Sequence, residues 1–139
     1  MGFDIYGVKP EGDIIPDQPD WTKGRDNDDI KAYFAWQQNT PGAYFRNNVW
    51  WWRPLWQFVC TSCDGILTSV DIEEGQMNNG HRISKTKAKR IAAKIRSMDK
   101  KGLIRDYEYQ WLDKEYPFNV KNVRDFAKFC DKSGGFDIC

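Results

Sequence analysis

Alternation of apolar and polar residues at the two ends of the chain predicts short strands. Residues 1–10 alternate in this way before Gly7 and Pro10 end the run. The stretch 135–138 repeats the Gly-Phe-Asp-Ile order of residues 2–5. We expect the two strands to pair as neighbours in one sheet, because pairing would hold ends of the chain that otherwise fray.

Helical spacing of apolar residues marks most of the remaining chain. The final helix is the best marked, because an asparagine precedes it, an apolar stripe follows, and Ser-Gly-Gly ends it. The helix that follows Ser84 likewise has apolar residues at spacings of three and four before Gly102. The pattern predicts helices over residues 28–38, 48–62, 84–102 and 119–133.

Three segments are harder to interpret. Residues 66–74, ILTSVDIEE, are typical of a strand or an extended connection, and residues 78–82 form a turn in which Gly80 takes a positive φ. Residues 103–116 fit a helix or an alternating strand; the period favours a helix that Pro117 ends. The first predicted helix has Asp28 or Asp29 as its cap.

Composition and length complete the fold prediction. The chain has 139 residues, enough for one hydrophobic core, and 15% of them are aromatic. We therefore predict an α+β fold: a single domain over residues 1–139, with about four helices packed on a small sheet that contains the two terminal strands.

The segment 44–60, YFRNNVWWWRPLWQFVC, is the densest in aromatic rings. On a helical wheel Trp52 and Trp56 share one broad face, with Trp51 beside them, so these rings are predicted to form the core. Trp50 falls on the opposite, polar stripe. One tryptophan of this segment is therefore predicted to face outward.

The residues around that outward tryptophan form a candidate ligand site. Two guanidinium groups would bind an anion, two amides would form hydrogen bonds, and one ring would stack on a nucleotide-like group. The candidate residues are Arg46, Asn47, Asn48, Trp50 and Arg53. In the alternative, structural interpretation, the second asparagine caps a helix, the arginines pair with acids of the N-terminal stretch, and the tryptophan is half-buried packing.

Positive charge is concentrated in residues 82–105, although 21 basic and 20 acidic residues leave the chain nearly neutral. This basic helix is an alternative site, for the phosphate backbone of a nucleic acid. Its candidate residues are Lys85, Lys87, Arg90, Lys94 and Lys101. The opposing interpretation is a solvated helix face, or one neutralised by residues 11–29.

Evidence for catalysis or metal binding is weak. Cys60 and Cys63 have CxxC spacing, but a zinc site would also need Cys130 and Cys139 to converge on them. His81 is the one histidine of the chain and is predicted to be a surface turn residue without a catalytic partner. No phosphate-binding glycine motif is present either. We predict no catalytic residues, no metal and no cofactor.

The chain has no run of about 20 apolar residues and no signal-peptide pattern at its start, so we expect no membrane association and a cytoplasmic location. In that compartment the default state of the cysteines is the free thiol. We expect buried or terminal thiols rather than disulfides.

Three blocks of the chain resemble a family of small hypothetical proteins of phages and bacteria, which open with Met-Gly-Met/Phe-Asp-Val/Ile-Tyr-Gly. The blocks are MGFDIYG (1–7), GAYFRNNVWWWRPLW (42–56) and YPFNVKNVRDFAKFCDKSGGFDIC (116–139), about a third of the chain. Residues 11–41 depart from the family pattern and would be a loop-rich insertion. The resemblance implies a phage or bacterial cytoplasmic protein and no particular reaction.

These observations together predict a non-enzymatic, phage-type accessory protein. It would bind a host macromolecule or a nucleotide-like or anionic ligand through the tryptophan segment. The first alternative is a nucleic-acid-binding protein that uses the basic helix, and the second is a virion or assembly component. The sequence sets neither the oligomeric state nor the identity of the partner.

Overall fold

The computed structural model describes residues 2–10, 15–113 and 115–139. Predictions that concern Met1, residues 11–14 of the expected insertion and residue 114 lie outside these ranges. In chain order the elements are β1 (Gly2–Gly7), a 3-10 turn (Trp21–Lys23), α1 (Asp28–Asn39), β2 (Tyr44–Asn48), α2 (Val49–Ser62), α3 (Ser69–Glu74), β3 (His81–Ile83), α4 (Lys85–Lys100), α5 (Leu103–Gln110), α6 (Val120–Ser133) and β4 (Phe136–Ile138).

The four strands form one antiparallel sheet in the order β2-β1-β4-β3. The predicted pairing of the terminal strands is confirmed, with Ile5 opposite Ile138. Asp4 and Cys139 extend this ladder by exchanging two backbone hydrogen bonds of 2.8 Å. The α+β prediction is therefore confirmed, and the two outermost segments of the chain lie at the centre of the sheet.

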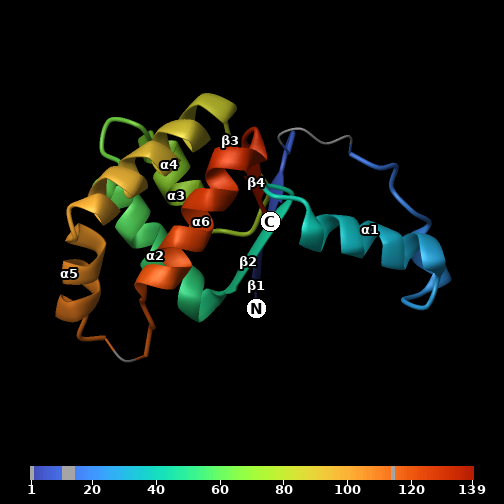
Figure 1. Ribbon diagram of the computed structural model, residues 1–139, viewed down its shortest axis with the longest axis horizontal. Coiled ribbons are helices and arrows are strands. Elements are labelled where there is room, and N and C mark those ends of the chain that lie inside the picture. Colours follow the sequence, from blue (N-terminus) through green and yellow to red (C-terminus); the bar gives the residue numbers. More distant parts are fainter. Residues whose placement is uncertain (1, 11–14, 114) are drawn as a thin grey trace.

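Helices cover the two faces of the sheet unequally (Figure 1). The helices α2 to α6 lie on one side, whereas α1 extends from the other side. The covered face carries alternate strand residues that are fully buried, as β-strand geometry requires. These residues are Phe3, Ile5, Ile83, Phe136 and Ile138, and their exposed fractions do not exceed 2%.

The aromatic helix α2 supplies the largest core side chains. Asn48 caps it by accepting a hydrogen bond from Trp51 N, which confirms the predicted start. Trp52 and Trp56 are buried and stack with ring centroids 5.4 Å apart. The core prediction is wrong for Trp51, which is only partly buried. Two tryptophans of this helix, not three, belong to the core.

The predicted helices α4 and α6 are confirmed with their caps, Ser84 and Asn119. They pack against each other, and their surfaces are joined by ion pairs. Asp131 accepts hydrogen bonds from Lys89 and Arg96, and Asp99 accepts two from Arg124.

Helix α3 corrects the predicted strand or extended segment at residues 66–74. Thr68 and Asp71 form a reciprocal capping box at its start. The indoles of Trp52 and Trp56 then donate hydrogen bonds to the Gly75 and Ile72 carbonyl oxygens at its end. Because tertiary contacts hold this short helix at both ends, the spacing of apolar residues in its own sequence does little to predict that it is helical.

Three further predictions need correction. The described residues contain six α-helices rather than about four. Asn27, not Asp28 or Asp29, caps α1. Helix α5 ends at Gln110, well before Pro117, because Trp111 turns to an extended conformation and its indole donates a hydrogen bond to the Tyr116 carbonyl oxygen at 2.6 Å.

Candidate functional site

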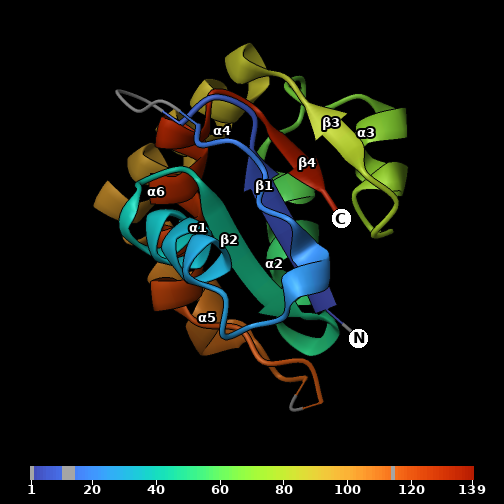
Figure 2. The ribbon, with the colours of Figure 1, turned by 90° about the vertical axis from the view of Figure 1, so that its right-hand side faces the viewer.

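One candidate site lies on the sheet face opposite the core, beneath α1. Figure 2 shows α1 in front of the sheet when the molecule is viewed from that side. A pocket of about 540 Å³ lies between them, a volume typical of small-molecule sites. We call it the aromatic pocket, because five of its lining residues carry rings: Tyr6, Trp21, Tyr33, Phe34 and Trp36.

Glycines allow the chain to place α1 over this face. Gly42 has φ of 82°, and a Cβ atom there would lie 2.2 Å from the backbone of Lys132. At Gly7 a Cβ atom would lie 1.8 Å from the Gly42 carbonyl oxygen. The backbones of β1, the turn after α1 and the end of α6 therefore approach more closely than side chains would permit.

The rings of the aromatic pocket support one another. Tyr33 packs edge-on against Trp21 at 5.3 Å and lies 5.6 Å from the ring of Trp36. Gln18 donates a hydrogen bond of 2.8 Å to the Tyr33 hydroxyl and accepts one of 3.2 Å from Trp21 Nε1. These contacts fix the ring positions before any ligand arrives, which reduces the ordering cost of binding.

Two polar side chains of the aromatic pocket lack partners. Trp36 Nε1 is buried and has no hydrogen-bond acceptor within the described part of the chain. The neighbouring Gln37 is 7% exposed, and its amide forms no hydrogen bond with any described residue. A buried donor without an acceptor costs about 1–3 kcal/mol, so this arrangement does not serve stability.

The charges around the aromatic pocket are already compensated. Asp137 is the one carboxylic acid among the described lining residues, and Arg82 binds it through two hydrogen bonds of 2.7 and 3.0 Å. Burial, with Asp4 adding to it, raises the pKa of Tyr6, so this phenol stays neutral near pH 7. The described lining residues therefore present rings and neutral polar groups rather than a net charge.

The residues predicted around Trp50 do not form one pocket. Arg46 lies on the outer face of β2, 3.6 Å from the carboxylate of Asp4 in β1. Asn47 points to the covered face and exchanges two amide hydrogen bonds with Asn122 of α6, at 3.0 and 2.8 Å. Asn48 is occupied as the cap of α2.

The other two residues of that set lie elsewhere. Trp50 is 50% exposed, and its ring packs against Tyr116 with centroids 5.2 Å apart. Arg53 lines a separate groove between α2 and α3. The strand and the helix meet at Asn48, so residues adjacent in sequence point to different surfaces.

The basic helix α4 is partly neutralised by acids of α3 and α6, whereas the part of the predicted acidic stretch at residues 11–14 lies outside the described residues. Lys87 donates a hydrogen bond to Asp71, and Lys89 and Arg96 pair with Asp131. None of the described acids between residues 15 and 29 pairs with α4. The remaining candidate cations are exposed without a carboxylate partner among the described residues: Lys85, Arg90, Lys94 and Lys101.

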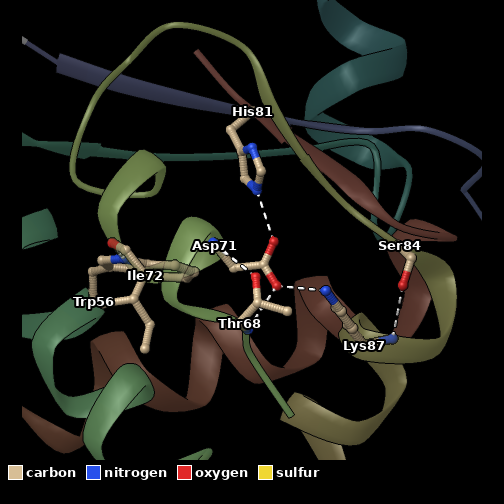
Figure 3. A network of polar contacts seen from close by, with 7 residues as sticks. All are labelled: Trp56, Thr68, Asp71, Ile72, His81, Ser84 and Lys87. Carbon is tan, nitrogen blue, oxygen red and sulfur yellow. Dashed lines mark hydrogen bonds and ion pairs between the residues drawn. The ribbon is translucent and has the colours of Figure 1, made fainter.

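The one histidine has a partner that the sequence did not reveal. His81 lies in β3 rather than in a surface turn, and its Nε2 is 2.8 Å from Oδ1 of Asp71 (Figure 3). The other oxygen, Oδ2, accepts hydrogen bonds from Lys87 Nζ and from Thr68 N. Asp71, which is 4% exposed, thereby joins α3, β3 and α4.

This network holds the fold together rather than forming a nucleophile-activating triad. Both oxygens of Asp71 are engaged, and the Ser84 hydroxyl accepts a hydrogen bond from Lys87 N as the cap of α4 (Figure 3). Burial by itself would raise the pKa of Asp71, but the hydrogen bonds from Lys87, Thr68 and His81 outweigh it and hold the pKa well below the usual value.

The cysteines are free thiols without a metal-site arrangement. No cluster of metal-binding side chains occurs among the described residues. Burial is the main cause that raises the pKa of Cys60 to about 12 and that of Cys63 to about 11. Both thiols are therefore protonated near neutral pH, which disfavours thiolate chemistry.

The comparisons with known proteins assign no family. No protein-family model matches the chain, and no curated protein or solved structure matches it either. Within the ranges that the structure describes, none of the helices combines the length and the apolar character needed to cross a bilayer.

Sequence reasoning missed the residues of the aromatic pocket. The rings Tyr33, Phe34 and Trp36 were assigned to a helix, and Trp21 to a loop, without a common site. An available signal was the high density of large rings in a polar stretch rich in acids, because such rings need a second surface to cover them.

Proposed function

We propose that this protein is a non-enzymatic binding protein whose aromatic pocket holds a flat, uncharged nitrogen heterocycle of the nucleobase type. The observation that supports it most is the unpaired, buried Nε1–H of Trp36, next to the free amide of Gln37. The edge of a nucleobase offers both acceptors and donors, and every base has a face that stacks on aromatic rings.

Charge compensation favours a neutral ring over a cation. An aromatic cage that binds an ammonium ion is usually assisted by negative charge. Here the carboxylate of Asp137 is bound in two places by Arg82, and an ammonium ion would offer no acceptor to Trp36 Nε1. A neutral heterocycle satisfies both the rings and the unpaired donor.

The experiment is a calorimetric titration with the four common ribonucleosides as probes. We expect saturable one-to-one binding of at least one nucleoside by the wild-type protein. Trp21→Ala should weaken this binding about tenfold or more, because stacking on one ring contributes about 1–3 kcal/mol per base.

Trp50→Ala is the matched control for that variant, because Trp50 is 50% exposed and Trp21 is 47% exposed, yet Trp50 lies outside the pocket. It should bind like wild type. Absence of saturable binding by wild type at about millimolar nucleoside would overturn the proposal. Equal losses in the two variants would also contradict it.

The broader setting is part of the same proposal. We place the protein in the cytoplasm of a bacterial host, as a phage-type accessory protein that acts on a host molecule. The four cysteines, all free thiols, support a reducing compartment. The three sequence blocks that resemble phage and bacterial proteins support the origin.

A second candidate function is nucleic-acid binding by α4, which is favoured by Lys85, Arg90 and Lys94, exposed cations without a carboxylate partner among the described residues. Binding would weaken steeply with added salt, and Arg90→Glu combined with Lys94→Glu would abolish it. Lys87 is unsuitable for this test because its ammonium group is needed by Asp71. Lys23→Glu with Lys31→Glu is the control of equal charge away from α4. Binding that is independent of salt, or lost equally in both double variants, would exclude this function.

A further inference from the structure

A second cavity lies on the other side of the sheet, between α2 and α3. It has a volume of about 530 Å³ and is lined by Arg53, Gln57, Cys60, Ile72 and Met77, with the indoles of Trp52 and Trp56 beneath. We call it the α2–α3 groove. None of the described residues lines both this groove and the aromatic pocket.

The base of the α2–α3 groove is apolar because its polar atoms are already used. Trp52 Nε1 donates to the Gly75 carbonyl oxygen at 2.9 Å, and Trp56 Nε1 donates to that of Ile72 at 3.1 Å. A Cβ atom on Gly75 would lie 2.2 Å from the ring of Trp56, so the end of α3 rests directly on the indole. A ligand in this groove finds no free hydrogen-bond donor at its base.

The apolar wall facing solvent is adaptable. Met77 is 44% exposed at the mouth of the groove, and a methionine side chain adjusts to an irregular ligand more readily than a branched one. Burial raises the pKa of the Cys60 thiol to about 12, so this side chain is a neutral, weakly polar part of the wall.

Arg53 provides the charge of the groove. It is the one ionised side chain among the described lining residues, is exposed, and has no carboxylate partner in the described part of the chain. Its guanidinium group presents a planar pair of donors that matches a carboxylate. The groove thus combines an apolar base, the neutral polar side chains of Gln57, Thr61 and Gln76, and one unpaired guanidinium. This combination favours a molecule with an apolar body and a single negative end.

We propose that the α2–α3 groove binds a small amphipathic carboxylate of the medium-chain fatty acid class. The hydrocarbon chain lies along Cys60, Ile72 and Met77, and the carboxylate accepts hydrogen bonds from Arg53. A phosphate group fits less well, because one guanidinium compensates one negative charge and no second cation lines the groove among the described residues. This site is independent of the proposed function and differs from it in both place and ligand.

The test uses decanoate and 1-decanol as probes, below the concentration at which decanoate forms micelles. Wild-type protein should bind decanoate saturably, and Arg53→Gln should lower the affinity for decanoate about tenfold or more, as expected for a hydrogen bond to a charged group. The affinity for 1-decanol should be the same in both proteins. Arg90→Gln, at an exposed arginine of α4, is the matched control and should bind decanoate like wild type.

Methyl spectra of protein labelled at its methionines locate the ligand. Decanoate should shift the methyl signal of Met77 and leave that of Met98, on the buried side of α4, in place. Three results would overturn the proposal: no saturable binding by wild type, an equal effect of the two arginine variants, or binding that shifts Met98 but not Met77. An equal effect of the two arginine variants would identify detergent-like adsorption, and a shift of Met98 alone would show that decanoate binds at another place.

Discussion

The indole of Trp36 lies 5.6 Å from the ring of Tyr33, and its Nε1–H is buried without an acceptor among the described residues. The two buried indoles of α2 differ from it, because both of their N–H groups donate to carbonyl oxygens at the end of α3. The tryptophan N–H groups of the core helix α2 are thus paired, whereas that of Trp36 in α1 has no acceptor among the described residues. This contrast is the structural basis for our proposal that the aromatic pocket binds a ligand.

Replacing Trp36 by phenylalanine should affect stability little. The substitution removes an unpaired buried donor as well as some packing, so we expect a change in the free energy of unfolding below about 1 kcal/mol. Trp52→Phe is the control: Trp52 is fully buried and hydrogen-bonded, and its loss should cost about 2–4 kcal/mol. Urea unfolding of both variants measures this. A larger loss for Trp36→Phe than for Trp52→Phe would show that Trp36 has a structural role.

Asp71→Asn should destabilise the fold by about 2–4 kcal/mol at neutral pH, because it leaves the ammonium group of Lys87 and the His81 ring beside a neutral amide in a largely buried position. Asp99→Asn is the comparison. Like Asp71, Asp99 pairs with a basic side chain, because it accepts two hydrogen bonds from Arg124, but it lies near the surface. The Asp99→Asn substitution should lower the free energy of unfolding by less than about 1 kcal/mol. Equal losses in chemical unfolding would contradict the structural role given to Asp71.

The contribution of Asp71 should disappear in acid. Its pKa in the folded protein is depressed from the usual 3.8 by hydrogen bonds from Lys87, Thr68 and His81. As the pH falls, Asp71 is protonated first in the unfolded chain. Its stabilising contribution is therefore fully present above the pKa of Asp71 in the unfolded chain, and it is lost as the pH falls towards the pKa in the folded protein. The difference in unfolding free energy between wild type and Asp71→Asn should be smaller at about pH 3 than at about pH 5. An undiminished difference at the lower pH would refute this assignment.

Gly42→Ala should disturb the placement of α1. The residue has φ of 82°, and a Cβ atom would also collide with the backbone of Lys132. Gly65→Ala is the matched control, because its φ is also 82° but nothing lies within 4 Å of the added atom. We expect a loss of about 1 kcal/mol for the control, from backbone strain alone, and a clearly larger loss at Gly42. Similar unfolding free energies for the two variants would show that the turn tolerates a side chain.

Features encoded by neighbouring residues were predictable from the sequence. Asn48, Ser84 and Asn119 are good caps in front of apolar stripes, and each starts a helix as expected. The Gly-Phe-Asp-Ile repeat likewise predicted the pairing of β1 with β4. In these cases a few adjacent residues determine the local structure, and the rest of the molecule agrees with them.

Features that depend on distant contacts were not predictable in the same way. Helix α3 is held by indoles from α2 and by His81 and Lys87 through Asp71, so its short sequence was misread as extended. The candidate ligand residues around Trp50 are contiguous in sequence, but the junction of β2 and α2 separates them. Conversely, Trp36 and Asp137 line one pocket only because α1 folds over the sheet.

The most direct test of the account observes Trp36 Nε1–H itself during a titration with nucleoside. In proton–nitrogen correlation spectra the signal is assigned by its absence in Trp36→Phe. We expect it to move downfield and to saturate as the proton gains an acceptor, while the Nε1 signal of Trp50 stays in place. A Trp36 signal that remains unchanged with all four ribonucleosides, or binding that Trp36→Phe leaves intact, would contradict the assignment of the aromatic pocket.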